Sequence, residues 1–428
     1  MADLTAERLP ALYAYRLPGV NLGDDKIYPN YPGNSILNIP SSICRLLEVS
    51  GLGAPPLETA LLDPLGTEVR RVVLVLMDAL ALHRLQGWMA AGLAPAWEKL
   101  SQQGLLAPLT SITPSTTCSA LTSLWTGRSP YEHGVMGYEM WMKEYGMIVN
   151  MILHSPAAFN GSAGSLEKAG FQPKNYLSFP TLAQHLAAQG IETHAFQHFS
   201  ISGSGLSQMI LNGARIHPFG SAPELWISVR QLLEAQPEQR MYTWVYWGNV
   251  DHLGHLHGPD DERPAAEFAN FSQAFAANFL DKLTPRARRG TVIILLADHG
   301  MITTPPDAHY ELHNHASLDR RLHMVPTGEN RLMYLYPRPG QIEAVREYIQ
   351  HTWLDSFRVV DSAYAAESGL FGGGERHPAL GDRLGDLVVF PGEKMYLWWA
   401  PHKNILHGRH GGLNPEEMLV PFLAARLD

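Results

Sequence analysis

Short apolar runs alternate with amphipathic stretches along this chain. The runs over residues 72–77 and 292–297 are rich in β-branched residues and flanked by polar ones, and a third over 241–250 is rich in Tyr, Trp and Val. Such runs predict buried strands of a parallel sheet. Helical apolar periodicity covers residues 81–103, 180–189, 222–235 and 262–283. The alternation predicts an α/β fold with a mostly parallel central sheet flanked by helices.

Each of the three apolar runs leads to an aspartate: Asp78, Asp251 and Asp298. An aspartate at this place can cap the following helix, and for Asp78 alone that interpretation is as good as a functional one. In open α/β sheets, however, ligands bind beyond the carboxyl ends of the strands. Three strands that each deliver a carboxylate therefore predict a functional edge.

The organisation of the chain points to one large unit. It has no internal repeat and no low-complexity linker, so we expect a single domain over residues 1–428. Residues 1–70 are rich in Pro, Gly and Asn and predict a lead-in segment wrapped on the core. Residues 138–180 and 301–395 carry many Gly, Pro and His with weak periodicity, which indicates cap or insertion segments at the active edge.

Composition narrows the class of protein. The 428 residues include 32 Lys+Arg and 41 Asp+Glu, a net charge of −9, which argues against a nucleic-acid binder with a basic surface. Two cysteines cannot build a disulfide scaffold. No apolar run approaches the roughly 18 residues of a membrane span, and the first residues do not read as a secretory signal. We expect a soluble, cytoplasmic protein without a membrane or nucleic-acid-duplex partner.

Several histidines stand where they could bind metal. Asp298 and His299 are adjacent and supply an oxygen and an imidazole nitrogen, both common zinc ligands. Asp251 and His255 are four residues apart and converge if a helical turn follows the strand. On spacing alone, the neighbouring His252 and His257 compete with His255 as metal ligands. His407 and His410, a glycine-flanked pair near the C-terminus, are equally typical of an exposed turn.

A hydroxyl-rich loop over residues 113–123 leads into a short helical stretch that ends before Gly127. Ser and Thr cluster at helix starts as caps, but a helix N-terminus also binds anions. A threonine hydroxyl needs a metal or a base before it acts as a nucleophile. Arg128, directly after Gly127, is either a phosphate ligand or a solvated surface residue.

In their order and spacing these features resemble the type I phosphodiesterase/nucleotide pyrophosphatase family of the alkaline phosphatase superfamily. The matching motifs are the strand ending in Asp78, Thr117 before Thr126-Gly127, residues 251–259, residues 298–301, and His410-Gly411. The resemblance implies an alkaline-phosphatase-like fold, and a small phosphoester substrate hydrolysed through a phospho-threonine intermediate on Thr117. It implies two Zn²⁺ sites, one with Asp78, Thr117, Asp298 and His299 and the other with Asp251, His255 and His410.

Two positions depart from the family pattern. Cys118 follows the nucleophile where nucleotide-hydrolysing members have an aromatic residue that helps hold the base. His133-Gly134-Val135 is not followed by the family's asparagine, which binds a phosphoryl oxygen. The resemblance therefore does not extend to nucleotide preference, and Tyr138 is a candidate hydrogen-bond donor to the phosphoryl group instead.

Other functions fit the same ligand set. A phosphomonoesterase, a phosphonate hydrolase and a manganese-dependent phosphomutase would use the same metal ligands, and a metal-stabilised binding protein would use no nucleophile. The spacing of His309, His313 and His315 would suit a further metal, a cleft lining or an exposed insertion. The physiological substrate, the native metals and the oligomeric state stay open.

Overall fold

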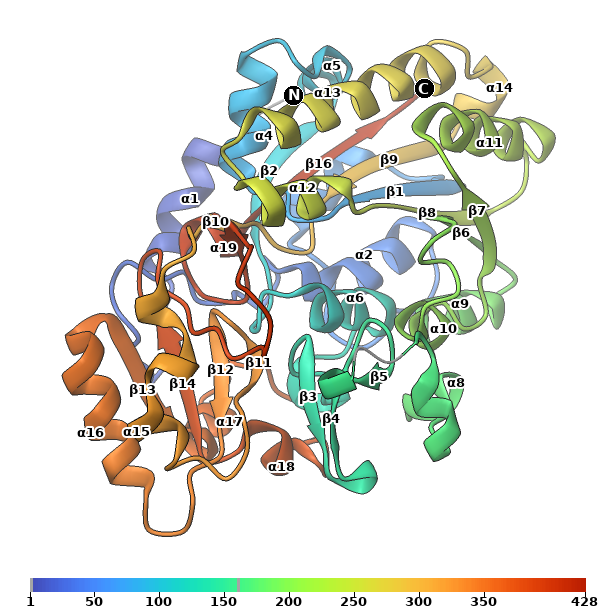
Figure 1. Cartoon of the computed structure of the whole chain (residues 1–428). Helices are drawn as coiled ribbons and strands as arrows, with labels where there is room; N and C mark the ends of the chain where they lie inside the picture. The colour runs from blue at the N-terminus through green and yellow to red at the C-terminus, as the bar shows by residue number, and fades with distance from the viewer. Residues whose placement is uncertain (1–2, 160–161) are drawn as a thin grey trace.

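A seven-stranded sheet with strand order β2-β16-β9-β1-β8-β6-β7 forms the centre of the molecule (Figure 1). The computed structural model describes residues 3–159 and 162–428. β16 pairs antiparallel with β2 and β9, and the other strands pair in parallel. The strands are β1 (Arg71–Met77), β2 (Leu105–Thr110), β6 (Glu192–His198), β7 (Arg215–Phe219), β8 (Met241–Trp247), β9 (Thr291–Leu296) and β16 (Leu419–Arg426).

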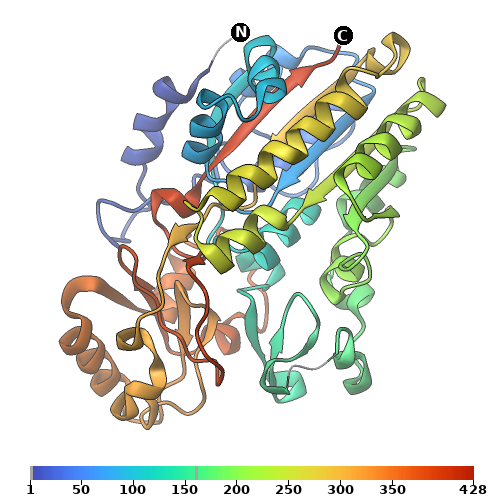
Figure 2. The same ribbon diagram turned by 45° about the horizontal axis from the view of Figure 1, so that its top comes forward.

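Helices cover both faces of this sheet, which confirms the predicted α/β fold. Figures 1 and 2 show α13 (Glu262–Phe275) lying across one face beside α4, α5 and α11, while Figure 1 shows α2 (Ile39–Leu46) and α6 (Thr117–Thr126) on the other. Alternation along β8 explains how one strand serves both layers. Trp244 packs edge-on against Trp125 of α6 at 5.2 Å between ring centroids, and Trp247 packs against Phe271 of α13 at 4.8 Å.

The helices follow the predicted segments, with differences that have local causes. α11 (Ala222–Ala235) coincides with its predicted range, and α9 (Leu182–Ala187) is shorter than 180–189. The segment 81–103 is two helices, α4 (Leu82–Ala90) and α5 (Pro95–Gln103), because Gly92 has φ +72° and Pro95 can only begin a helix. The segment 262–283 continues beyond α13 as a π-helix over Ala276–Leu280.

A second seven-stranded sheet is antiparallel and lies beside the first (Figure 1), in the order β13-β14-β12-β11-β3-β4-β5. Gly328 of β11 pairs with Glu139 of β3, so the two segments predicted as insertions form one sheet. Val345 and Ile349 of helix α16 (Ile342–Trp353) pack into a small hydrophobic core that is separate from the core of the central sheet. The strands are β3 (Glu139–Met142), β4 (Met147–Asn150), β5 (Ser155–Pro156), β11 (Thr327–Glu329), β12 (Leu332–Leu335), β13 (Phe357–Asp361) and β14 (Leu387–Pro391).

The described part of residues 1–70 packs on the core, with its first residues along the edge strand β2 and α2 on one face of the central sheet. The Leu4 amide donates to the Leu106 carbonyl at 2.8 Å, and the Ile27 amide donates to the Leu413 carbonyl at 2.9 Å. Ile27 and Tyr28 are fully buried. Within residues 3–159 and 162–428, every helix is too short or too polar to cross a bilayer.

Candidate active site

Three aspartates meet at the carboxyl edge of the central sheet. Asp78 follows β1 directly, Asp298 lies two residues beyond β9, and Asp251 lies in α12 (Asn249–His257), which follows β8. Because β9, β1 and β8 are neighbours in the sheet, their carboxyl ends lie side by side. Asp78 and Asp298 are buried, with 2% and 0% of their surfaces exposed, and Asp251 is partly buried.

Three histidines direct the same ring nitrogen, Nε2, toward these aspartates, while the other ring nitrogen, Nδ1, lies against a backbone carbonyl. The Nδ1 atom of His255 lies 2.8 Å from the Gly408 carbonyl, that of His299 2.8 Å from the Gly300 carbonyl, and that of His410 3.1 Å from the Ser115 carbonyl. A carbonyl only accepts, so each Nδ1 carries the proton and each Nε2 keeps a free lone pair. Burial, with the nearby His299 and His255, lowers the pKa of His410 well below its ordinary value.

The free Nε2 atoms and carboxylate oxygens converge. His299 Nε2 lies 3.4 Å from Asp78 Oδ1 and 3.5 Å from Asp298 Oδ2. Asp251 Oδ1 lies 3.3 Å from His255 Nε2 and 3.8 Å from His410 Nε2.

Among the described residues there are two groups of three potential metal ligands, and within each group the ligand atoms all lie within 4.8 Å of one another. One group is Asp78, Asp298 and His299, and the other is Asp251, His299 and His410. His299 is thus common to both groups, while His255 joins the second set only through Asp251. The sequence-based partition placed His299 in one set alone.

The cluster concentrates negative charge. Asp78 Oδ1, Asp251 Oδ1 and Asp298 Oδ2 are buried without a hydrogen-bond partner. Burial raises the pKa of Asp78 well above its ordinary value, and the charges of Asp298 and Asp251 raise it further. Burial likewise raises the pKa of Asp298. Unpartnered carboxylate oxygens beside neutral imidazoles are the donor set that Zn²⁺ and similar divalent ions prefer, so these residues fit a metal centre.

Thr117 brings a hydroxyl to this cluster. It is the first residue of α6, is 7% exposed, and its Oγ1 lies 3.1 Å from His299 Nε2. The first N–H groups of a helix lack acceptors within the helix and attract anions. The threonine hydroxyl, the helix N-terminus and the potential metal ligands therefore face one place.

Arg128 and Tyr138, the two residues predicted to contact substrate, lie in different places in the structure. Arg128 lies beyond the far end of α6, about 15 Å along the helix from Thr117, and pairs with Glu132 at 2.9 Å. Arg128 is thus not brought to the cluster. Tyr138 is 39% exposed, and its Oη accepts a hydrogen bond from the Asn150 side chain at 2.6 Å. Burial raises the pKa of Tyr138 to about 12, so its hydroxyl keeps a proton to donate.

Among the described residues, Cys118 and the competing histidines belong to neither group of potential metal ligands. Cys118 is fully buried, and burial raises the pKa of its thiol well above the ordinary value. It therefore replaces the family's aromatic residue without offering a ligand surface. His252, His257 and His407 are exposed.

Two residues of the site have no signal in the sequence motifs. The Tyr246 hydroxyl donates to Asp78 Oδ2 from β8, and only the alternation of that strand could have indicated that it points the same way as Trp244. Glu329 accepts hydrogen bonds from the Thr116 hydroxyl and, at 2.8 Å, from the Tyr138 amide. Glu329 comes from the antiparallel sheet, and no spacing relates it to Thr116.

The histidines at 309, 313 and 315 do not converge. His315 uses both ring nitrogens, Nδ1 at 3.0 Å from the Tyr348 hydroxyl and Nε2 at 2.8 Å from the His309 carbonyl. His313 lies 3.4 Å from Glu311. In the part of the chain that the structure describes, no third metal-ligating group forms here.

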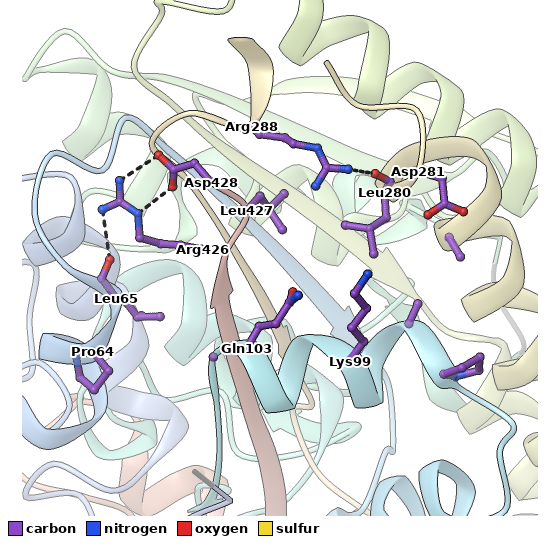
Figure 3. Close-up of a pocket in the computed structure, with 14 residues that line it drawn as sticks. Pro64, Leu65, Lys99, Gln103, Leu280, Asp281, Arg288, Arg426, Leu427 and Asp428 are labelled. Atoms are coloured by element: carbon purple, nitrogen blue, oxygen red, sulfur yellow. Dashed lines mark hydrogen bonds and ion pairs between the residues drawn. The ribbon is translucent and has the colours of Figure 1, made fainter. Parts of the chain in front are cut away.

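A cavity of about 780 Å³ lies at the opposite end of the sheet, where β16 ends beside the start of β9. Figure 3 shows two of its arginines bonded within the lining: Arg426 to Asp428 and the Leu65 carbonyl, and Arg288 to the Leu280 carbonyl. Its described lining residues include aspartates but no histidine. The metal-ligand cluster and this cavity are therefore separate features.

Comparison with known proteins identifies the family. The sequence model of the type I phosphodiesterase/nucleotide pyrophosphatase family matches residues 72–413. That range contains every residue of the cluster. No curated protein matches the chain.

Solved structures share the fold at low sequence identity. Murine ectonucleotide pyrophosphatase/phosphodiesterase 5 is 17% identical, with a TM-score of 0.61, over 83% of this chain and 87% of that one. An inactive variant of the murine protein in complex with AMP gives 17% identity and a TM-score of 0.60 over 83% and 88%. Phosphonoacetate hydrolase from Sinorhizobium meliloti 1021 in complex with phosphonoformate is 19% identical, with a TM-score of 0.61, over 84% and 90%. All three have the alkaline-phosphatase-like architecture.

Proposed function

The chain belongs to the type I phosphodiesterase/nucleotide pyrophosphatase family, and on that basis we propose that it is a di-zinc phosphodiesterase that works through a covalent intermediate on Thr117. The observation that carries the proposal is the convergence of three unpartnered aspartate oxygens on three imidazoles beside one threonine hydroxyl. Buried carboxylates repel one another, so this donor set destabilises the fold unless cations offset its charge.

We assign the metal ligands to two ions as the family resemblance implies. Asp78, Asp298 and His299 would hold one ion together with the Thr117 oxygen. Asp251, His255 and His410 would hold the other. When bound, the ions supply Lewis acidity, which lowers the pKa of an attached hydroxyl and offsets charge on the phosphoryl oxygens.

The protein's own residues position the reacting groups. Carbonyls of Gly300, Gly408 and Ser115 fix the three imidazoles with Nε2 toward the site. The Thr117 oxygen forms a bond to phosphorus as the ester bond to the leaving oxygen breaks, which leaves phospho-threonine. Water then cleaves the phospho-threonine bond and restores the hydroxyl. The N-terminus of α6 favours the anionic group throughout.

Turnover on a panel of phosphoesters tests this function. The purified protein, supplied with Zn²⁺, is expected to hydrolyse bis-p-nitrophenyl phosphate faster than p-nitrophenyl phosphate and to lose this activity in chelator. A preference for p-nitrophenyl phosphate would favour a phosphomonoesterase, and release of phosphate from phosphonoacetate alone would favour a phosphonate hydrolase. Metal-loaded protein that cleaves none of these would contradict the proposal.

A further inference from the structure

Glu329 holds a carboxyl group between the two halves of the candidate active site. On one side it accepts the hydrogen bond of Thr116, the residue before the nucleophile. On the other side it lies against Gly411, the residue after the ligand His410: a Cβ built on Gly411 would be 2.6 Å from the Cβ of Glu329. The charge of Asp251 is also felt at Glu329, where it raises the pKa. Glu329 therefore contacts the residue before the nucleophile and the residue after a metal ligand.

The hydrogen-bond partners of this carboxyl are neutral groups, the Thr116 hydroxyl and the Tyr138 amide. Two ionisable groups near it, Glu139 and Asp251, are themselves acidic and raise its pKa. Among the residues that the structure describes, no cation pairs with this carboxyl, so once ionised it is an unneutralised negative group of the site.

Two arginines lie close in sequence to Glu329 and His410, but each of them already contacts other partners. Arg331, two residues from Glu329, forms a fully buried pair with Glu417 at 2.7 Å. Arg409, next to His410, donates to Thr304 and Asn404 and lies over the Tyr396 ring at 3.7 Å from its centroid. Neither guanidinium offsets charge on a bound phosphoryl group.

We propose that Glu329 is a specificity-determining residue, which makes the site select phosphoryl groups carrying one negative charge over those carrying two. The inference rests on the proposed function and deepens it. A carboxylate close to the phosphoryl position repels a dianionic monoester more than a monoanionic diester, because the Coulomb energy scales with the product of the charges. Diester preference is then set on the antiparallel sheet rather than by the metal ligands.

The assay needs a pH at which the Glu329 side chain is ionised. Burial raises the pKa of Glu329 to about 8. At about pH 9 most of the side chain is therefore charged, p-nitrophenyl phosphate is a dianion and bis-p-nitrophenyl phosphate is a monoanion.

The test compares Glu329→Gln with the wild type at about pH 9. The amide keeps an oxygen to accept from Thr116 and Tyr138 and removes only the charge. We expect the ratio of kcat/KM for p-nitrophenyl phosphate to that for bis-p-nitrophenyl phosphate to rise at least tenfold. Glu238→Gln is the control and should leave this ratio unchanged. The Glu238 side chain is exposed and pairs with Arg70 and Arg286.

Two results would overturn the inference: an equal fall on both substrates, which a merely structural residue would give, or a fall in the ratio. Binding provides an independent arm if the wild type cleaves neither substrate, a result that counts against the proposed function alone. Calorimetry of the Zn²⁺-loaded proteins with inorganic phosphate and with dimethyl phosphate is then decisive. Glu329→Gln should tighten phosphate binding at least fivefold and change dimethyl phosphate binding less than twofold, and equal changes would contradict the role of Glu329.

Discussion

The parallel and the antiparallel sheet contribute different things to one site. Neighbouring strands β9, β1 and β8 deliver aspartates from their carboxyl ends, and these strands are buried on both faces. The antiparallel sheet and the turn leading into it deliver Glu329 and Tyr138, and Glu329 accepts hydrogen bonds from the Tyr138 amide and the Thr116 hydroxyl. We infer that the rigid, buried sheet holds the chemistry, and that the sheet built from distant segments selects the substrate.

A buried ion pair joins the two regions. Arg331, in the turn between β11 and β12, contacts Glu417 of α19 (Pro415–Met418), which leads into β16. Both side chains are fully buried, and Glu417 also accepts from the Gly412 amide at 2.9 Å. This pair ties the antiparallel sheet to the segment that carries His410.

The largest effect is expected at the nucleophile on the parallel-sheet side. Thr117→Ala should lower kcat on bis-p-nitrophenyl phosphate by about a thousandfold or more, because no other hydroxyl replaces the attacking oxygen. Metal content, measured by elemental analysis, should stay unchanged. Thr126→Ala, at the other end of α6, is the matched control and should keep kcat within about threefold. Near wild-type turnover by Thr117→Ala would end the nucleophile assignment.

Next in size is the seam between the sheets. Arg331→Met leaves Glu417 buried without its partner, which costs about 3–5 kcal/mol of unfolding free energy. Urea unfolding measures the change, and the double variant Arg331→Met/Glu417→Leu should recover most of the loss. A single variant as stable as the wild type would show that the sheets do not depend on this pair.

A third prediction concerns stability of the metal-free protein. The pKa of Asp78 is raised on folding, so its carboxyl stabilises the fold below the unfolded pKa of about 3.9 and loses that contribution as pH rises through the folded pKa. In chelator, Asp78→Asn should therefore melt progressively higher than the wild type as pH rises from about 4 to 8. Asp24→Asn, on an exposed side chain, should show no such trend. A flat or falling difference for Asp78→Asn would contradict the charge cluster.

The smallest effect is expected on the antiparallel-sheet side. Tyr138→Phe removes one neutral hydrogen-bond donor, worth about 0.5–1.5 kcal/mol, so kcat/KM on the diester should fall by about 2- to 13-fold. Steady-state kinetics measures this fall, with metal content constant. Loss of metal, or a thousandfold loss of rate, would place Tyr138 with the chemistry and erase the distinction between the sheets.

The same distinction explains what the sequence revealed. Asp78 and Asp298 end short apolar runs, and Asp251 and His255 are spaced for one helical turn, so local pattern and family motif together indicate them. Gly328, the neighbour of Glu329, pairs with Glu139 of β3 far earlier in the chain, and no local periodicity encodes that pairing. Gly92 and Pro95 in the sequence account for the break of residues 81–103, whereas no sequence motif marks the π-helix after Phe275.

Metal stoichiometry tests the central claim most directly. Elemental analysis of the wild-type protein after Zn²⁺ loading and desalting should find two equivalents per chain. Asp298→Ala and His255→Ala should each retain fewer, while the exposed control Asp281→Ala should retain two. A wild type that binds no metal, or ligand variants that keep both equivalents, would contradict the account.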